Sequence, residues 1–181
     1  MPRFLDGTIA DGAYTAPDGD FTVMLPHPDA YEARWMQAKE VPSDLGLYVS
    51  FGPAAFDQSI YRVVVYRERG EPGEQADLAR IAHGLAADYS VQLQPMTGEP
   101  LVLAAEERAE VDGCPAWCLR YTQAAPAGTL QDEASTIEHV SYTVQRGDRV
   151  YSTWVQSCAG YGRQRGVDAV TFTASVAFPT R

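Results

Sequence analysis

The residues with the clearest potential for ligand binding lie in one glycine-rich segment. Residues 160–166 spell Gly-Tyr-Gly-Arg-Gln-Arg-Gly and include Tyr161, Arg163 and Arg165. The segment lacks the Lys-Ser/Thr ending of a phosphate-binding P-loop, but arginine presents a planar fork that suits a carboxylate or phosphate. We expect any ligand site to use this loop, with two aromatic residues at its base, Trp154 and Tyr151. A flexible connector is the alternative, because three glycines let the loop bend without any binding role.

Histidine and cysteine residues are scattered, and none has the spacing of a metal site. The three histidines are His27, His83 and His139. No two of them stand four residues apart, and no His-Glu-x-x-His motif occurs. Cys114 and Cys118 are separated by three residues, which is neither a redox Cys-x-x-C nor a usual zinc pair, and Cys158 stands alone. We therefore expect no metal and no organic cofactor, while the disulfide state of the three cysteines stays open.

No nucleophile motif is present either. The chain has no Gly-x-Ser-x-Gly, the strained turn that exposes a hydrolase serine. A small hydrolase with a site assembled in space from His139 and Ser or Asp side chains remains an alternative, since catalytic triads form in space and not in sequence. The acidic residues at 106, 107, 110 and 112 predict a solvated edge. A calcium site is the alternative, but the spacing of these residues is not that of an EF-hand.

The charge of the chain narrows the class of partner. Of 181 residues, 14 are Lys or Arg and 24 are Asp or Glu, which gives a net charge of −10. Nucleic-acid affinity comes largely from neutralising phosphates with cations, so nucleic acid is an unfavourable partner. We expect a protein or a small anionic ligand. No run of apolar residues is long enough to span a membrane.

The source and compartment are indicated only indirectly. Lys39 is the only lysine among the 14 cations, which, with frequent Ala, Gly and Asp, is typical of a GC-rich bacterial genome. The first residues show no apolar stretch of signal-peptide length. The compartment stays open: periplasmic or lipoprotein if a leader was removed, otherwise cytoplasmic.

Alternating apolar residues predict a mostly antiparallel sheet. The expected strands are 21–25, 45–51, 59–68, 101–111, 116–123, 137–145, 149–157 and 169–178, with 146–148 as the turn of a hairpin. Residues 29–41 are ambiguous, since helix-tolerant residues coincide with an alternating Tyr31, Ala33 and Trp35; we favour extended structure.

One amphipathic helix interrupts the strands. Residues 74–89 place apolar side chains at steps of three and four along one stripe: Leu78, Ile81, Ala82, Leu85 and Tyr89. A loop is expected around Gln94 and Pro95. Strands with one inserted helix imply an α+β domain over 14–181, an antiparallel sheet of about six or more strands with that helix packed on it, after an N-terminal tail, 1–13.

Three short blocks carry a family resemblance. They are Tyr14-x-x-Pro-x-Gly-x-Phe-x-Val-x-Leu-Pro26, Val111-Asp-Gly-Cys-Pro-Ala116, and the hairpin end Gly147-Asp-Arg-Val-Tyr-Ser152 followed by the strand Phe172–Phe178. Together they resemble the bacterial branch of the Mog1/PsbP-like domains, small envelope lipoproteins and related proteins. The resemblance implies an α/β/α sandwich and no catalytic residues. The chain departs from it at 160–166, where a glycine-rich segment replaces a helix.

We accordingly expect a non-catalytic binding or interaction module, associated with the bacterial envelope. A secretion-system chaperone or immunity-type partner is one alternative, and the small hydrolase is the other.

Overall fold

The computed structural model describes residues 8–16, 19, 21–24, 37–40, 45–51, 60–67, 75–128, 133–147, 149–158 and 175–178. A small antiparallel sheet has the order β1–β2–β3: β1 (Thr8–Ala10), β2 (Ala13–Thr15) and β3 (Thr22–Met24). Seven further strands form the central antiparallel sheet, in the order β4–β5–β6–β10–β9–β8–β7: β4 (Gln37–Glu40), β5 (Leu45–Phe51), β6 (Ile60–Arg67), β7 (Val102–Val111), β8 (Cys114–Ala125), β9 (Ser135–Arg146) and β10 (Arg149–Cys158).

The strand predictions are confirmed across the central sheet, because alternation of apolar residues is strong there. β5 has the predicted bounds, and β7 begins one residue later than predicted. β6 covers 60–67 of the predicted 59–68, and residues 59 and 68 lie outside the described residues. β9 and β10 form the predicted hairpin, with Gly147 at a φ of 62° in its turn. In the ambiguous range 29–41, residues 37–40 are strand β4, as favoured; 29–36 and 41 lie outside the described residues.

Two hairpins turn on an Asp-Gly pair. Asp11 and Gly12 connect β1 to β2 with φ of 51° and 76°, and Asp112 and Gly113 connect β7 to β8 with φ of 50° and 71°. Positive φ at both central residues is the type I′ geometry that matches the twist of an antiparallel pair. β1 begins within the segment predicted as the N-terminal tail, 1–13.

The helix α1 spans Leu78–Thr97, so the predicted bounds 74–89 are wrong at both ends. It starts later because the side chain of Asp77 caps it, accepting a hydrogen bond from the backbone N–H of Arg80 at 3.0 Å. It continues through the expected loop because Pro95 lies in the last turn and removes only one helical hydrogen bond. Gly98, with a φ of 78°, then ends the helix.

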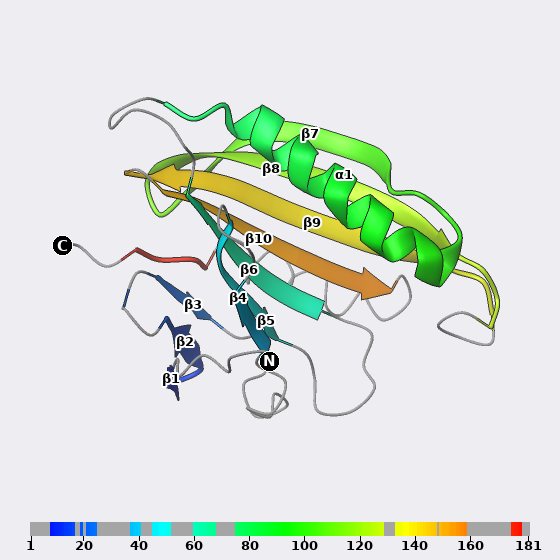
Figure 1. Cartoon of the computed structure of the whole chain (residues 1–181), viewed down its shortest axis with the longest axis horizontal. Helices are drawn as coiled ribbons and strands as arrows, with labels where there is room; N and C mark the ends of the chain where they lie inside the picture. The colour runs from blue at the N-terminus through cyan, green and yellow to red at the C-terminus, as the bar shows by residue number, and fades with distance from the viewer. Residues whose placement is uncertain are drawn as a thin grey trace.

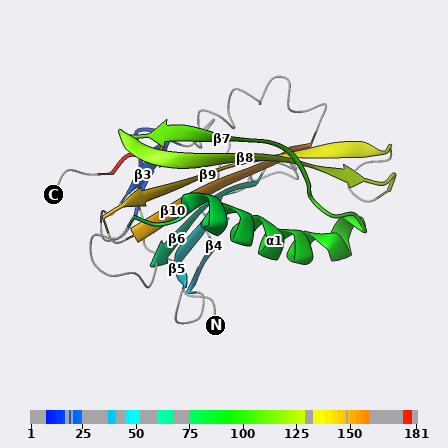
Figure 2. The same cartoon turned by 90° about the horizontal axis from the view of Figure 1, so that it is seen from above.

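The packing of α1 also differs from the predicted stripe. Among its described apolar residues, Ala82 and Ala86 are buried against the sheet and Tyr89 packs beside them. Leu78, Ile81 and Leu85 are only half-buried. Figures 1 and 2 show α1 lying along one face of the central sheet. Small alanines let the helix approach β8 and β9 closely, where large aromatic side chains of the sheet fill the space beside it.

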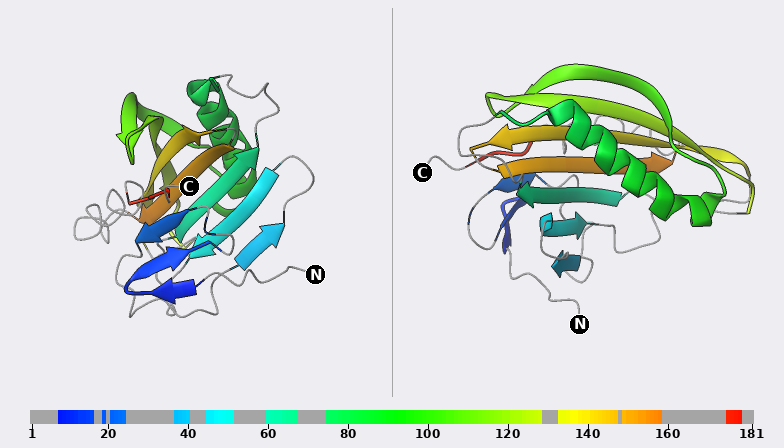
Figure 3. Two further views of the ribbon diagram at one scale, coloured as in Figure 1. Left: turned by 90° about the vertical axis from the view of Figure 1, so that its left-hand side faces the viewer. Right: turned by 45° about the horizontal axis from the view of Figure 1, so that its top comes forward.

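The opposite face of the central sheet is covered by β1–β3 and by residues 175–178 (Figure 3). The N–H of Thr22 donates to the carbonyl of Ala177 at 2.9 Å, and the N–H of Ala177 donates back at 3.0 Å. Of the predicted final strand 169–178, residues 169–174 lie outside the described residues, and 175–178 form an isolated bridge at Ala177 and no strand. Val176 and Phe178 are buried. The predicted class, an antiparallel α+β fold with one main helix on the sheet, is confirmed.

Candidate functional site

Of the five predicted site residues, the structure describes two, Trp154 and Tyr151. Tyr161, Arg163 and Arg165 lie outside the described residues. Trp154 and Tyr151 both lie on β10 and are each 4% exposed. They are three residues apart, and successive side chains of a strand point to opposite faces, so they belong to different layers of the molecule.

Tyr151 is part of the core beneath the small sheet. Its ring meets Phe21 edge-on at a centroid distance of 6.0 Å and Phe178 at 4.7 Å. Both partners come from segments that cover the sheet. Tyr151 therefore fixes the N-terminal and C-terminal segments to β10.

Trp154 lies under α1, in the second core cluster. Its ring packs on Tyr89 at 4.7 Å and stacks with Tyr121 at 6.2 Å. The indole N–H donates a hydrogen bond to Nδ1 of His139 at 3.2 Å. Because an indole can only donate, Nδ1 accepts, and His139 is in its neutral form with a proton on Nε2.

The sheet face beneath α1 carries a layer of buried polar side chains, which we call the polar layer: Gln123, His139, Ser141, Thr143, Ser152 and Gln156. Thr143 and Ser152 share a hydrogen bond of 3.3 Å between their hydroxyls, and the amide of Gln123 donates to Oγ1 of Thr97 at 2.8 Å. Among the described residues, no partner is found for Oγ of Ser141 or Oε1 of Gln156. Buried groups of this kind are commonly satisfied by ordered water.

His139, which the hydrolase alternative would use as its base, belongs to this layer. It is 1% exposed and lies between the sheet and α1. In this arrangement a substrate in solution does not reach its ring. The position favours a structural role for His139, holding Trp154 in place.

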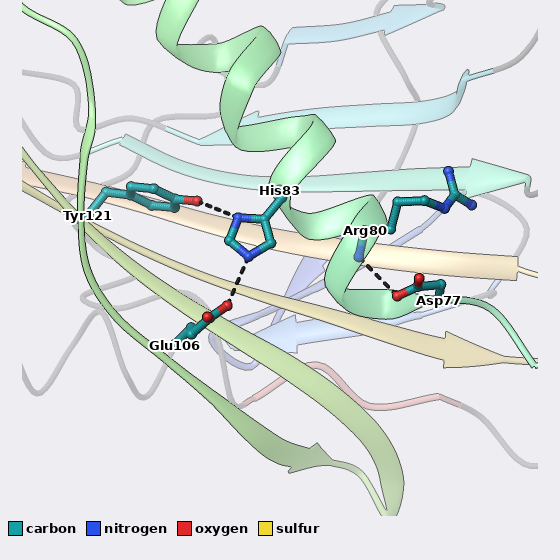
Figure 4. Close-up of polar contacts among 5 residues, drawn as sticks. All are labelled: Asp77, Arg80, His83, Glu106 and Tyr121. Carbon is teal, nitrogen blue, oxygen red and sulfur yellow. Dashed lines mark hydrogen bonds and ion pairs between the residues drawn. The ribbon is translucent and has the colours of Figure 1, made fainter.

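His83 of α1 forms a partly exposed cluster with Glu106 of β7 and Tyr121 of β8 (Figure 4). Its Nε2 lies 2.8 Å from Oε2 of Glu106 on β7, and its Nδ1 lies 3.3 Å from the hydroxyl of Tyr121 on β8. Burial raises the pKa of Tyr121, and the negative charge of Glu106 raises it further. The phenol thus stays protonated at neutral pH, which suits a hydrogen bond and not a nucleophile. His83 thus ties α1 to the sheet.

The structure describes two of the three thiols. Cys114 and Cys118 are free, Cys114 half-buried and Cys118 buried. Burial raises the pKa of Cys118, so little thiolate forms near neutral pH. Within the described stretches no group of three His, Cys, Asp or Glu side chains could hold a metal ion. In the same stretches, α1 is not apolar enough to cross a membrane.

Among the four central strands whose side-chain exposure is described, β7 to β10, β7 is the most exposed. It is the last strand in the sheet order, and the only strand paired with it among the described residues is β8. Its side chains from 102 to 108 and at 110 are exposed, on both faces of the sheet. Two are large and apolar, Val102 at 59% exposure and Leu103 at 42%. Three of the four predicted solvated acidic residues follow on the same strand: Glu106, Glu107 and Glu110.

Comparison with known proteins identifies the fold. No family model and no curated protein matches this sequence. Among solved structures, the chain is similar to cyanobacterial PsbP from Synechocystis sp. PCC 6803, with a TM-score of 0.61 and 10% identity over 96% of both chains. It is also similar to the Ran-binding protein Mog1p of Saccharomyces cerevisiae, with a TM-score of 0.51 and 11% identity over 96% of both chains. The chain therefore has a Mog1/PsbP-like fold, as the resemblance in sequence implied.

A third similar structure is a protein of Bacteroides thetaiotaomicron, with a TM-score of 0.52 and 9% identity. The likeness covers 96% of this chain and 50% of that one. At these identities the likeness concerns the fold.

Proposed function

We propose that this protein is a non-catalytic binding module that takes a protein partner at the edge strand β7. The observation that carries the proposal is the exposure of this strand on both faces, with no strand beside its outer edge among the described residues. An open edge presents unpaired backbone N–H and C=O groups, which an extended segment of another protein can use.

Two further considerations support a binding role. The fold of Mog1p, a Ran-binding protein, is shared by this chain, and that protein binds a protein partner. The two described histidines, which have the potential for acid–base chemistry, also occupy structural positions. His139 lies under α1, and His83 holds α1 to Glu106.

Two finer parts of the proposal come from the sequence. Association with the bacterial envelope follows from the resemblance, and an upstream leader with a lipid-attachment cysteine at the genomic start site would support it. A small anionic ligand at Tyr161, Arg163 and Arg165 remains a proposal about a loop outside the described residues.

Site-specific cross-linking tests the binding role. A photoreactive side chain would be placed at Val102 on β7 and, as a control, at Met24 on β3, which is 48% exposed and belongs to the small sheet. Both variants would be irradiated in a lysate of the source organism, and the adducts identified by mass spectrometry.

We expect a specific protein adduct from Val102 and none of the same protein from Met24. A protein captured from Met24 alone would refute the location at β7. If neither position, nor pull-down with the wild-type chain, recovers a specific protein, the proposal of a protein-binding module fails.

A further inference from the structure

We infer that the β7 edge accepts an extended basic segment of the partner as an added strand, paired along residues 105–111. This inference deepens the proposed function and rests on it. Three observations support it: the regular pairing of residues 105–111, the charges along these residues, and the exposed apolar residues that precede them.

The usable part of the edge is set by a β-bulge. The pairing of β7 with β8 shifts between Leu103 and Ala105, and from Ala105 to Val111 it is regular. A bulge interrupts the row of backbone groups on an edge and hinders unselective pairing. An added strand can therefore follow the edge continuously from Ala105, over roughly 20–25 Å at the rise of an antiparallel strand.

The charges of this stretch select the partner. Glu106, Arg108 and Glu110 alternate along one face of β7, and Glu107 lies on the other. Three carboxylates against one guanidinium leave the stretch acidic, in a chain whose net charge is −10. A strand with Lys or Arg opposite Glu106 and Glu110 would place a cation against each of these two carboxylates on one face of β7.

The three carboxylates do not contribute equally. Glu106 already lies 2.8 Å from His83, and Glu107 lies 3.9 Å from Arg120 on the neighbouring strand. Glu110 is the exposed acidic residue of the regular stretch for which no ion pair is found among the described residues. The strongest discrimination for a basic segment should therefore arise at Glu110.

A second copy of this chain is a poorer occupant of the same edge. Pairing β7 with another β7 would bring two acidic stretches together, and like charges directly across two strands are destabilising. A basic segment meets no such repulsion. The exposed side chains of Val102 and Leu103 lie just before the bulge, so a partner with apolar residues at that end would also cover them.

Synthetic peptides test the inference on the full chain. The probe is a lysine–valine alternating peptide as long as the stretch 105–111. One control replaces each lysine with glutamate, and another carries N-methyl groups on alternate amides, which keeps the charge but prevents strand pairing. Binding would be followed by titration, and the site by hydrogen exchange of the β7 backbone amides.

We expect the lysine peptide to slow exchange in β7 and both control peptides to bind at least about fivefold more weakly, the upper range for a cross-strand charge pair. Glu110→Lys should weaken the lysine peptide by a similar factor. Asp88→Lys, the same charge change at an exposed position of α1, should leave it nearly unchanged.

Three results would overturn the inference. Equal binding of the N-methylated peptide would mean attraction by charge without strand addition, and an equal effect of Asp88→Lys would mean attraction to the whole acidic chain. Self-association of the chain alone that Glu110→Lys alters would assign the edge to a second copy. In each case a partner cross-linked from Val102 would leave the protein-binding proposal standing.

Discussion

The contact between Trp154 and His139 provides a quantitative test of the polar layer. Trp154→Phe removes the N–H that donates to Nδ1 of His139, at a site where both side chains are at most 4% exposed. A buried acceptor left without its donor costs about 1–3 kcal/mol. The missing second ring adds a cavity cost on the order of 1 kcal/mol. His139→Leu leaves the indole N–H of Trp154 unpaired instead, again at a cost of about 1–3 kcal/mol.

The double variant should cost less than the sum of the two single variants, because neither donor nor acceptor is then left alone. We expect a coupling of at least about 1 kcal/mol between the two positions. Urea unfolding followed by circular dichroism would give the four free energies without depending on tryptophan fluorescence. Trp117→Phe is the matched control, because its indole N–H is buried and has no partner among the described residues. Additivity of Trp154→Phe and His139→Leu within about 0.3–0.5 kcal/mol would refute the assigned hydrogen bond.

Three other predictions address the turns, the buried thiol and the loop. Gly113→Ala should lower the free energy of unfolding because of its φ of 71°, whereas Gly84→Ala, in an open position of α1, should raise it by about 0.4–1 kcal/mol; equal effects in urea unfolding would contradict the turn geometry. Because burial raises the pKa of Cys118 above its ordinary value of 9.0, the unfolded chain loses this proton first as pH rises, so its contribution is full below about pH 9 and decreases at higher pH. Cys118→Ala should therefore reduce the loss of stability between neutral and strongly alkaline pH, and an unchanged loss would argue against a buried thiol. Replacing both Arg163 and Arg165 with Ala should alter the set of partners captured from lysate and its salt sensitivity; an unchanged set would make the loop a connector.

Much of the fold could be predicted because local patterns determine it. The alternation in β5, β6 and the β9–β10 hairpin reports a strand directly. The bounds of α1 could not be predicted as well, because Asp77 competes with other polar residues as a cap and Pro95 is tolerated only where the helix is about to end. Asp11-Gly12 is a pair typical of type I′ turns and could have indicated the β1–β2 hairpin, but this turn lies within the segment predicted as a tail.

The candidate site was harder to predict because it depends on strand order. The spacing of Tyr151 and Trp154, an odd number of residues on one strand, does indicate opposite faces. The polar layer instead depends on the register of β9 and β10, which aligns His139 with Gln156 and Thr143 with Ser152. Likewise, nothing local in residues 102–111 shows that this strand lies at the edge.

The contact between β3 and the C-terminal segment has a consequence for the synthesis of the chain. The N–H of Met24 donates to Oγ of Ser175 across a separation of 151 residues. At about 5–20 residues per second, a ribosome needs roughly 8–30 s to make the intervening chain. During that interval Phe21 and Val23 have been translated but cannot yet acquire the cover that Val176 and Phe178 provide. The nascent chain therefore exposes apolar side chains until its last segment emerges, and a holdase that binds such segments would act on it before release.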